Sequence, residues 1–170
     1  MSIQIEKANT KVQLDQVRDL IRDFLRWHLY RHEEDKELIN EYFNHLDFEE
    51  ELASLPGKYA APGGSLLLAS IDSEPAGCVA LRKIDDRTCE MKRMFVYDQF
   101  KGKGVGNALA KAIIEEAHRI GYSVMKLDTS FRQIEAQKLY QKFGFLKTEP
   151  YYSLPQKLKD WLVFMELKLQ

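Results

Sequence analysis

The chain has 170 residues, of which 45% are apolar and 30% are charged, and its formal net charge is −1. This length and apolar content favour one domain with a sizeable core, so we expect residues 1–170 to form a single domain. A nearly neutral chain has no overall field to recruit nucleic acid or a membrane surface, and no run approaches the ~20 apolar residues of a membrane-spanning helix. Because the first residues also lack an apolar signal core, we expect a cytoplasmic protein with no nucleic acid or membrane partner.

The first part of the chain is predicted to be mainly helical. After a short strand at 2–8, Thr10 and Gln13 have the spacing of a capping box, and the apolar residues that follow recur at helical intervals. A second helical segment is predicted over 36–55, with an interruption near Asp47. Its apolar stripe consists of Leu38, Ile39, Tyr42, Phe43 and Leu46.

Three strands with short connecting turns are predicted next, at 65–71, 76–84 and 89–97. The apolar residues beyond the loop that follows them recur at helical spacing as far as Gly121, which ends that helix. The next strand, 124–129, must lie parallel to its neighbour if this helix is a crossover connection.

The last part of the chain is predicted to hold one more helix and two strands. Ser130 and Gln133 have the spacing of another capping box, which would begin a helix that runs to Phe143. Gly144 ends this helix, and a strand begins at Phe145. The final segment alternates like a half-buried strand, with one side formed by Trp161, Val163, Met165, Leu167 and Leu169.

The two cysteines, Cys78 and Cys89, stand in predicted strands without a C-x-x-C spacing. Buried reduced thiols fit this placement, and a disulfide or a metal site is the alternative. The histidines lack metal-ligand spacing with either cysteine, so we expect no metal.

A glycine-rich loop separates the strand at 89–97 from the helix that follows it. Its glycines, Gly102, Gly104 and Gly106, let backbone amides approach an anion, and the start of the helix adds unpaired donors. A P-loop would need Ser or Thr after Gly-Lys, and a dinucleotide fingerprint would need the spacing G-x-G-x-x-G. Neither spacing is present, so the loop is a phosphate-binding candidate of another kind.

Two motifs resemble the GNAT superfamily of acetyl-CoA-dependent N-acetyltransferases. Residues 101–106, KGKGVG, resemble the signature Arg/Gln-x-x-Gly-x-Gly/Ala, with Lys101 in place of Arg or Gln. Residues 136–145, AQKLYQKFGF, resemble the family's later element A-x-x-L-Y-x-x-x-G-F. The resemblance implies acetyl-CoA as cosubstrate and an α/β (α+β) fold. This fold is a mixed, mostly antiparallel sheet of about seven strands, in the order βααβββαβαββ, with helices on both faces.

The same resemblance implies where the cofactor binds. Backbone amides of the loop would hold the pyrophosphate, the two loop lysines would add positive charge, and amides near the end of the preceding strand would polarise the thioester carbonyl. The implied cofactor-binding residues are Phe95, Val96, Lys101, Gly102, Lys103, Gly104, Val105, Gly106, Asn107 and Gln133.

For catalysis, the resemblance implies that Tyr140 donates a proton to the coenzyme A thiolate, and a buried tyrosine of the core is the alternative. Glu90 stands where relatives place a general base, but a surface pair with Lys92 would explain it equally well. Alternation places Glu90, Lys92 and Met94 on one face of the strand and Arg93 on the other. Asp128 is a second candidate base.

The acceptor is expected to be an amine of a small molecule or a peptide. Nine acidic residues between Glu33 and Glu51 could attract a cationic amine, although a solvated helical face is the alternative. The acceptor cleft could also be lined by Tyr30, Tyr42, Tyr151 and Tyr152, with aromatic packing as the alternative for each. The last strand could support a homodimer. The competing interpretations of function are a non-catalytic acyl-CoA-binding or regulatory module, and a transferase for oxygen acceptors or longer acyl chains.

Overall fold

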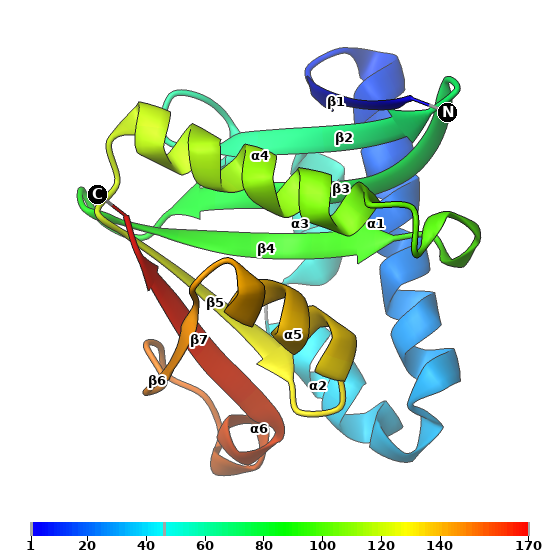
Figure 1. Cartoon of the computed structure of the whole chain (residues 1–170). Helices are drawn as coiled ribbons and strands as arrows, with labels where there is room; N and C mark the ends of the chain where they lie inside the picture. The colour runs from blue at the N-terminus through cyan, green and yellow to red at the C-terminus, as the bar shows by residue number, and fades with distance from the viewer. Residues whose placement is uncertain (1, 46, 170) are drawn as a thin grey trace.

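The computed structural model describes residues 2–45 and 47–169, and within them seven strands form one sheet in the order β1-β2-β3-β4-β5-β7-β6 (Figure 1). The strands are β1 (Ile3–Lys7), β2 (Ser65–Ile71), β3 (Glu74–Lys83), β4 (Thr88–Val96), β5 (Val124–Ser130), β6 (Leu146–Thr148) and β7 (Leu162–Lys168). In the described sheet, all neighbours are antiparallel except β4 and β5, which are joined by a helical crossover and are parallel. The predicted mixed, mostly antiparallel sheet is confirmed.

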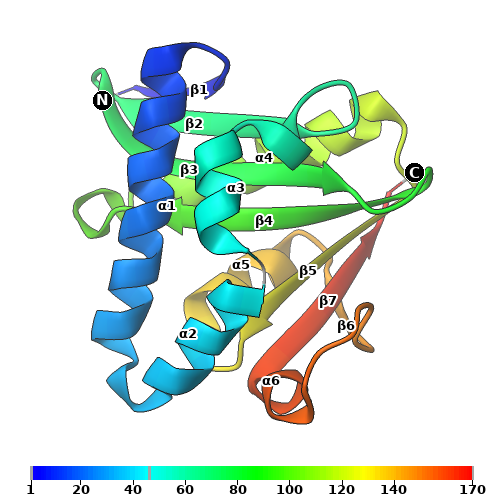
Figure 2. The same cartoon turned by 180° about the vertical axis from the view of Figure 1, so that it is seen from behind.

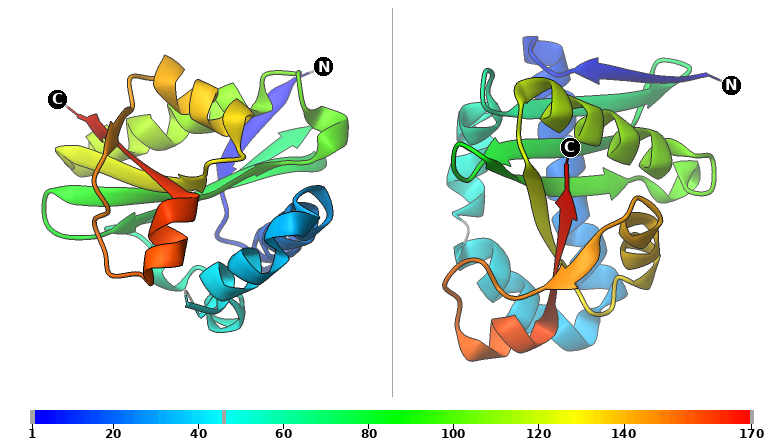
Figure 3. Two further views of the ribbon diagram at one scale, coloured as in Figure 1. Left: turned by 90° about the horizontal axis from the view of Figure 1, so that it is seen from below. Right: turned by 60° about the vertical axis from the view of Figure 1, so that its left-hand side comes forward.

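Helices cover both faces of the sheet, as predicted (Figures 2 and 3). They are α1 (Lys11–Arg31), α2 (Lys36–His45), α3 (Phe48–Ser54), α4 (Val105–Ile120), α5 (Ile134–Lys142) and α6 (Gln156–Trp161). One face carries α1, α2 and α3, and the opposite face carries α4 and α5 (Figures 1 and 2). Each helical layer buries a separate apolar core against the sheet.

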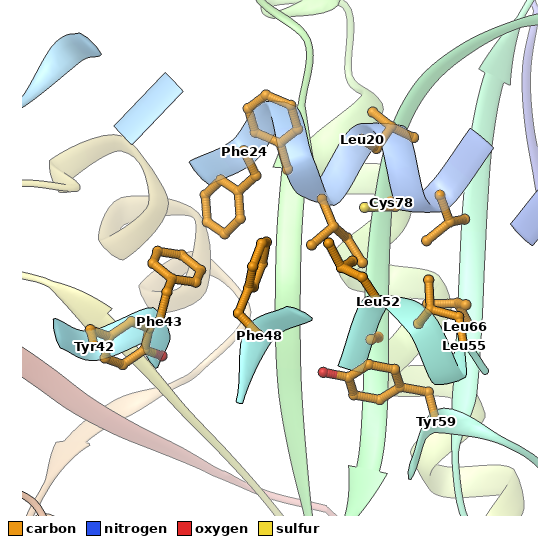
Figure 4. Packing of buried hydrophobic residues seen from close by; sticks show 14 of the residues in the cluster. Leu20, Phe24, Tyr42, Phe43, Phe48, Leu52, Leu55, Tyr59, Leu66 and Cys78 are labelled. Carbon is orange, nitrogen blue, oxygen red and sulfur yellow. The ribbon is translucent and has the colours of Figure 1, made fainter. Parts of the chain in front are cut away.

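The core beneath α1, α2 and α3 is rich in aromatic side chains (Figure 4). The ring of Phe43 meets that of Phe24 edge-on at a centroid distance of 6.2 Å, and it meets Phe48 in the same way at 5.1 Å. The ring of Phe24 also lies 5.2 Å from that of Phe95 on β4. These contacts attach three helices to the sheet beside the end of β4, since aromatic pairs stabilise packing beyond the area that they bury.

One helix was not predicted. The sequence analysis gives the order βααβββαβαββ, whereas the structure places α6 between β6 and β7. Helix α6 has only six residues, and its buried side consists of Leu158 and Trp161, too few for a recognisable helical period. The second helical segment is divided at Asp47 into α2 and α3, as expected, and Leu46 lies outside the described residues.

The two predicted capping boxes have different outcomes. Thr10 and Gln13 form the predicted box at the start of α1, with both reciprocal hydrogen bonds present. The second box does not cap α5, because that helix begins at Ile134 and its N-cap is Gln133, which makes no side-chain cap hydrogen bond. One bond of the predicted pair is present, from the amide of Ser130 to the side chain of Gln133 at 3.3 Å. The Ser130 hydroxyl has no hydrogen-bond partner in the described part of the chain.

A β-bulge in β4 changes which side chains share a face. The pairing of β4 with β3 shifts register beside Arg93, whose φ is +59°. The predicted alternation, with Met94 beside Glu90 and Lys92, is therefore wrong. Arg93 lies with Glu90 and Lys92 on the side of α2 and α3, and Met94 packs against the opposite core. The reason is that a bulge inserts one extra residue and reverses the order of faces beyond it.

Strands β4 and β5 separate soon after they pair. Their parallel ladder joins Thr88–Glu90 to Val124–Lys126, and beyond it the strands diverge (Figure 1). The later part of β4 and the end of β5 therefore present backbone and side chains toward a common opening in the sheet.

Cys78 and Cys89 are free and buried, one in each core, as expected of reduced thiols. Among the described residues, none of the helices combines the length and apolarity that a membrane crossing requires. The same residues contain no group of three or more His, Cys, Asp or Glu side chains that could hold a metal ion.

Candidate active site

The glycine loop between β4 and α4 leaves a row of backbone donors free. Gly102 and Gly104 have φ values of +77° and +87°, a conformation that side chains disfavour. The carbonyl of Gly104, the N-cap of α4, accepts from the amide of Ala108 at 3.0 Å. Within the described ranges, the amides of residues 102–107 have no acceptor. Six free amides at the positive end of a 16-residue helix fit a pyrophosphate.

A groove of about 460 Å³ opens beside this loop, between α1, the end of β4 and α5. The side chains of Trp27, Phe100 and Leu139 give it an apolar lining suited to the arm of an elongated ligand. Of the predicted cofactor-binding residues, it is lined by Phe95, Val96, Lys101, Gly102, Gly104, Val105, Gly106, Asn107 and Gln133.

The two loop lysines contribute less charge to the groove than the sequence analysis predicts. The ammonium of Lys101 pairs with the carboxylate of Asp98 at 2.8 Å and lies 4.2 Å from the ring centroid of Trp27. Lys103 does not line the groove, and its ammonium lies 5.6 Å from the ring centroid of Phe100. The anion-binding capacity of the loop therefore resides mainly in its backbone amides.

A smaller internal cavity, of about 50 Å³, lies where β4 and β5 diverge. It shares Phe24, Met94 and Gln133 with the groove, so the two spaces meet at the opening in the sheet. Both predicted catalytic residues, Glu90 and Tyr140, line this cavity. The topology thus brings together residues that are 50 positions apart in the chain.

Tyr140 reaches the cavity from α5. Its side chain is buried, yet its hydroxyl makes no hydrogen bond to any residue that the structure describes. Burial raises the pKa of Tyr140 above its ordinary value, and the negative charge of Asp128 raises it further. The hydroxyl is therefore protonated at neutral pH.

Glu90 is buried, with 1% of its surface exposed, so the surface pair with Lys92 is wrong. Its Oε1 accepts from Arg82 Nε at 2.6 Å, and its Oε2 accepts from the hydroxyl of Tyr151 at 2.5 Å. Burial acts to raise the pKa of Glu90, but the positive charges of Lys92 and Arg82 outweigh it and hold the pKa below its ordinary value. Glu90 is therefore ionised at neutral pH.

Asp128, the second candidate base, lines the same cavity from β5. Its two carboxylate oxygens accept hydrogen bonds from the hydroxyls of Tyr42 and Tyr152, at 2.5 Å and 2.6 Å. Tyr42 lines the same cavity, whereas Tyr151 and Tyr152 bond to the two carboxylates but line neither space, and their rings pack together at a centroid distance of 5.2 Å. Tyr30 is 89% exposed on α1.

Sequence reasoning missed Lys92 as a functional candidate. It is buried and lines the cavity, with its ammonium 4.0 Å from Glu90 Oε1. A lysine between a glutamate and an arginine on a strand is typical of a solvated surface, and only the burial of this part of β4 by three helices reveals its position.

The acidic segment between Glu33 and Glu51 is not simply a solvated face, because several of its carboxylates form ion pairs with other elements. Asp35 pairs with Arg132, Glu41 pairs with Lys157, and Glu51 pairs with the buried Arg93. Its charge is thus partly used to attach α2 and α3 to the rest of the molecule.

Comparisons with known proteins identify the family. The model of the acetyltransferase (GNAT) family matches residues 15–145. An uncharacterised N-acetyltransferase of Schizosaccharomyces pombe is 39% identical over 125 residues, which cover 71% of this chain and 77% of that protein. N-acetylaspartate synthetase of Danio rerio is 36% identical over 110 residues, which cover 62% of this chain but 39% of that protein.

The fold comparison agrees. An acetyltransferase structure from Streptococcus agalactiae has a TM-score of 0.74 at 20% identity and covers 98% of both chains. The PaiA N-acetyltransferase of Thermoplasma acidophilum, solved with coenzyme A, has a TM-score of 0.72 at 20% identity and covers 99% of this chain and 100% of that one. The chain therefore belongs to the GNAT family: it is an acyltransferase enzyme, and its cosubstrate is acetyl-CoA.

Proposed function

We propose that the protein moves the acetyl group of acetyl-CoA to the primary amine of a small molecule or peptide, by direct transfer while both substrates are bound. The observation that carries this proposal is the junction of two spaces. The groove with the free amides meets the cavity that contains Tyr140, Glu90 and Asp128 at the opening between β4 and β5. A donor in the groove and an acceptor in the cavity would meet without a covalent enzyme adduct.

The groove would hold coenzyme A through the amides of residues 102–107, with its apolar arm along Trp27 and Leu139. When bound, acetyl-CoA supplies an activated acetyl group on a thiol leaving group. Beyond Glu90, no ladder bond to β5 is made in the described sheet, so the edge of β4 near Phe95 and Val96 is free to donate to the carbonyl.

We assign proton donation to Tyr140. Its hydroxyl is protonated, makes no hydrogen bond within residues 2–45 and 47–169, and lines the cavity where the two spaces meet. A raised pKa makes a phenol a weaker acid. However, a thiolate that leaves in the same desolvated place also has a raised proton affinity, so the transfer stays close to balanced.

We assign proton removal from the amine to Glu90. A primary ammonium has a pKa of about 10, so the substrate first loses one proton to solvent, at a cost of roughly 4 kcal/mol at pH 7, and the neutral amine then attacks the thioester. As the new N–C bond forms, the nitrogen becomes positively charged and much more acidic, and an ionised carboxylate can then receive the proton. Glu90 meets this requirement directly or through the hydroxyl of Tyr151, which bonds to it at 2.5 Å.

A non-catalytic acyl-CoA-binding module is the less supported function. Such a module would need the groove and its amides, but it would have no use for a tyrosine hydroxyl and two carboxylates that line the adjoining cavity. A panel of primary amines tests the proposal, with free coenzyme A measured by a thiol reagent and products identified by mass spectrometry. Acetylation of at least one amine is expected, together with intersecting initial-velocity lines. Binding of acetyl-CoA with no acetylated amine would overturn the proposal. Parallel comparison of oxygen acceptors and longer acyl-CoA thioesters separates the remaining transferase chemistries.

Replacing Gly104 by alanine tests the anion site. A side chain at φ +87° costs about 1–2 kcal/mol and should move the amides of the loop, so we expect roughly tenfold weaker binding of coenzyme A by calorimetry. Gly121→Ala is the matched control, because Gly121 ends the same helix at φ +107° and an added Cβ there meets no atom of the described residues within 4 Å. It should carry a similar strain and leave binding unchanged. Equal affinity losses in the two variants would contradict the assignment of the site.

Replacing Glu90 by glutamine is expected to lower kcat about 10–100-fold at neutral pH with little change in the KM for acetyl-CoA, because the amide cannot accept a proton. Arg82→Gln is the control for the lost ion pair, since Arg82 bonds to Glu90 but does not line the cavity. Steady-state kinetics at pH 6–9 distinguish the two variants. If kcat falls equally in both, Glu90 acts through structure and not as the proton acceptor.

A further inference from the structure

The cavity between β4 and β5 contains hydrogen-bond donors that have no acceptor among the described residues. The side chain of Lys92 is only 5% exposed, yet its ammonium makes no hydrogen bond to the described residues, and its nearest anion is Glu90 Oε1 at 4.0 Å. The hydroxyl of Ser130 also lines the cavity, is buried, and has no partner in the part of the chain that the structure describes. A buried donor without an acceptor is costly, so the enclosed hydroxyl of Ser130, in the cavity that also holds the unbonded ammonium of Lys92, indicates a missing ligand atom.

The two carboxylates of the cavity, in contrast, already accept hydrogen bonds. Each oxygen of Glu90 already accepts a short hydrogen bond, one from Arg82 and one from Tyr151. Each oxygen of Asp128 likewise accepts from a tyrosine hydroxyl. Among the charged groups that line the cavity, Lys92 is the one that makes no hydrogen bond within the described residues, and its complement is an acceptor with negative charge.

Lys92 is not the nearest cation to Glu90, although its charge helps to hold the pKa of that carboxylate low. Arg82 lies 2.6 Å from the same oxygen, which is much closer than the 4.0 Å of Lys92. Burial lowers the pKa of Lys92, and the negative charges of Glu90 and Asp128 oppose this effect only in part. An incoming anion would supply the missing compensation.

We propose that the acceptor amine carries a carboxylate, as a free α-amino acid does, and that the ammonium of Lys92 binds this carboxylate with the hydroxyl of Ser130 as a second donor. This inference rests on the proposed function and names the substrate class for the same site. The amine of such a substrate lies a few ångströms from its carboxylate, so a carboxylate at Lys92 leaves the amine beside Glu90 and the opening where the thioester arrives.

The size of the cavity agrees with a compact substrate head. A volume of about 50 Å³ accommodates only a few water-sized groups, which suits a carboxylate and an adjacent amine better than an extended polyamine. Within the acidic segment, Asp35, Glu41 and Glu51 are engaged in ion pairs, which reduces the negative charge available to a polycationic acceptor. An order of preference led by polycations is therefore not expected.

The wild-type enzyme provides the first test. The rate of coenzyme A release is measured with the protein amino acids, with their carboxamides, and with the corresponding decarboxylated amines. We expect kcat/KM for the preferred amino acid to exceed that for its carboxamide and its decarboxylated amine by at least 100-fold. Equal or faster acetylation of the neutral or polycationic amines would overturn the proposal while leaving the proposed N-acetyltransferase function intact. If acetyl-CoA binds but none of the compounds is acetylated, the result would instead count against the proposed function itself.

The second test compares variants. Lys92→Met keeps the length and burial of the side chain but removes its charge, and Glu90 retains Arg82 and Tyr151 as partners. We expect the KM for the preferred amino acid to rise at least 30-fold, and its kcat/KM to fall at least tenfold further than that of its decarboxylated amine, which loses only the effect of Lys92 on Glu90. Ser130→Ala should raise the same KM severalfold.

Lys147→Met is the control, because it removes one exposed positive charge from β6, and it should leave the kinetic constants for both substrates unchanged. Equal losses with both substrates in Lys92→Met would assign Lys92 a structural role and overturn carboxylate recognition. If Lys92→Met does not fold, Ser130→Ala and the wild-type comparison still decide the matter.

Discussion

Replacing Tyr140 by phenylalanine is expected to lower kcat by about 10²–10⁴-fold, the usual contribution of a positioned general acid, while the affinity for acetyl-CoA stays nearly unchanged. The hydroxyl is the only group removed, and Tyr140 lines the cavity and not the groove beside the glycine loop. The departing thiolate would then leave without a proton. The kinetics are measured at saturating acetyl-CoA, and cofactor affinity is measured separately by calorimetry.

The stability of this variant is informative because the Tyr140 hydroxyl makes no hydrogen bond to the described residues. Its removal should therefore leave the free energy of unfolding unchanged. Tyr122→Phe is a matched control in the same core, where the hydroxyl of Tyr122 donates to the carbonyl of Gly63 at 2.5 Å. That variant should lose about 1 kcal/mol of stability and retain full activity. Unchanged turnover in Tyr140→Phe would remove Tyr140 as the acid.

The contrast between these two tyrosines illustrates what the sequence alone could predict. The glycine loop could be predicted because positive φ, helical periodicity and an anion site all depend on neighbouring residues. Tyr140 could be predicted for the same reason, because it belongs to a motif of neighbouring residues, 136–145. By contrast, no local pattern distinguishes a tyrosine whose hydroxyl is bonded from one whose hydroxyl is free.

The acceptor side of the site depends on contacts between distant segments. Glu90 meets Tyr151 across 61 positions, and Asp128 meets Tyr42 across 86. Lys92 has the sequence environment of a surface residue, and its burial arises only when helices from the first part of the chain cover β4. The faces of β4 were mispredicted for a related reason, since alternation holds only as long as the strand is regular and the bulge at Arg93 interrupts it.

Glu51→Gln is expected to cost about 3–5 kcal/mol of unfolding free energy at pH 7, because it leaves the guanidinium of Arg93 buried without its anion. Glu51 accepts from Arg93 Nε at 2.8 Å and from Nη2 at 3.0 Å, and Lys58 lies 3.0 Å from the same carboxylate. These contacts hold Arg93 at φ +59° in the bulge of β4, beside the cavity. Chemical denaturation at pH 7 measures the loss.

The pH dependence of stability provides an independent check on the same carboxylate. Burial acts to raise the pKa of Glu51, but hydrogen bonds and charge from Arg93 outweigh it and lower the pKa from 4.5 to about 2. A pKa lowered by folding stabilises the protein above pH 4.5, and this stabilisation, roughly 3 kcal/mol, is lost as the pH falls toward 2. The wild type should therefore lose more stability than Glu51→Gln over this interval.

Glu49→Gln is the control. Glu49 is 76% exposed in its pair with Arg22, so this variant should change the free energy of unfolding by less than about 1 kcal/mol. If the wild type and Glu51→Gln lose the same amount of stability over this interval, the buried pair does not hold the bulge.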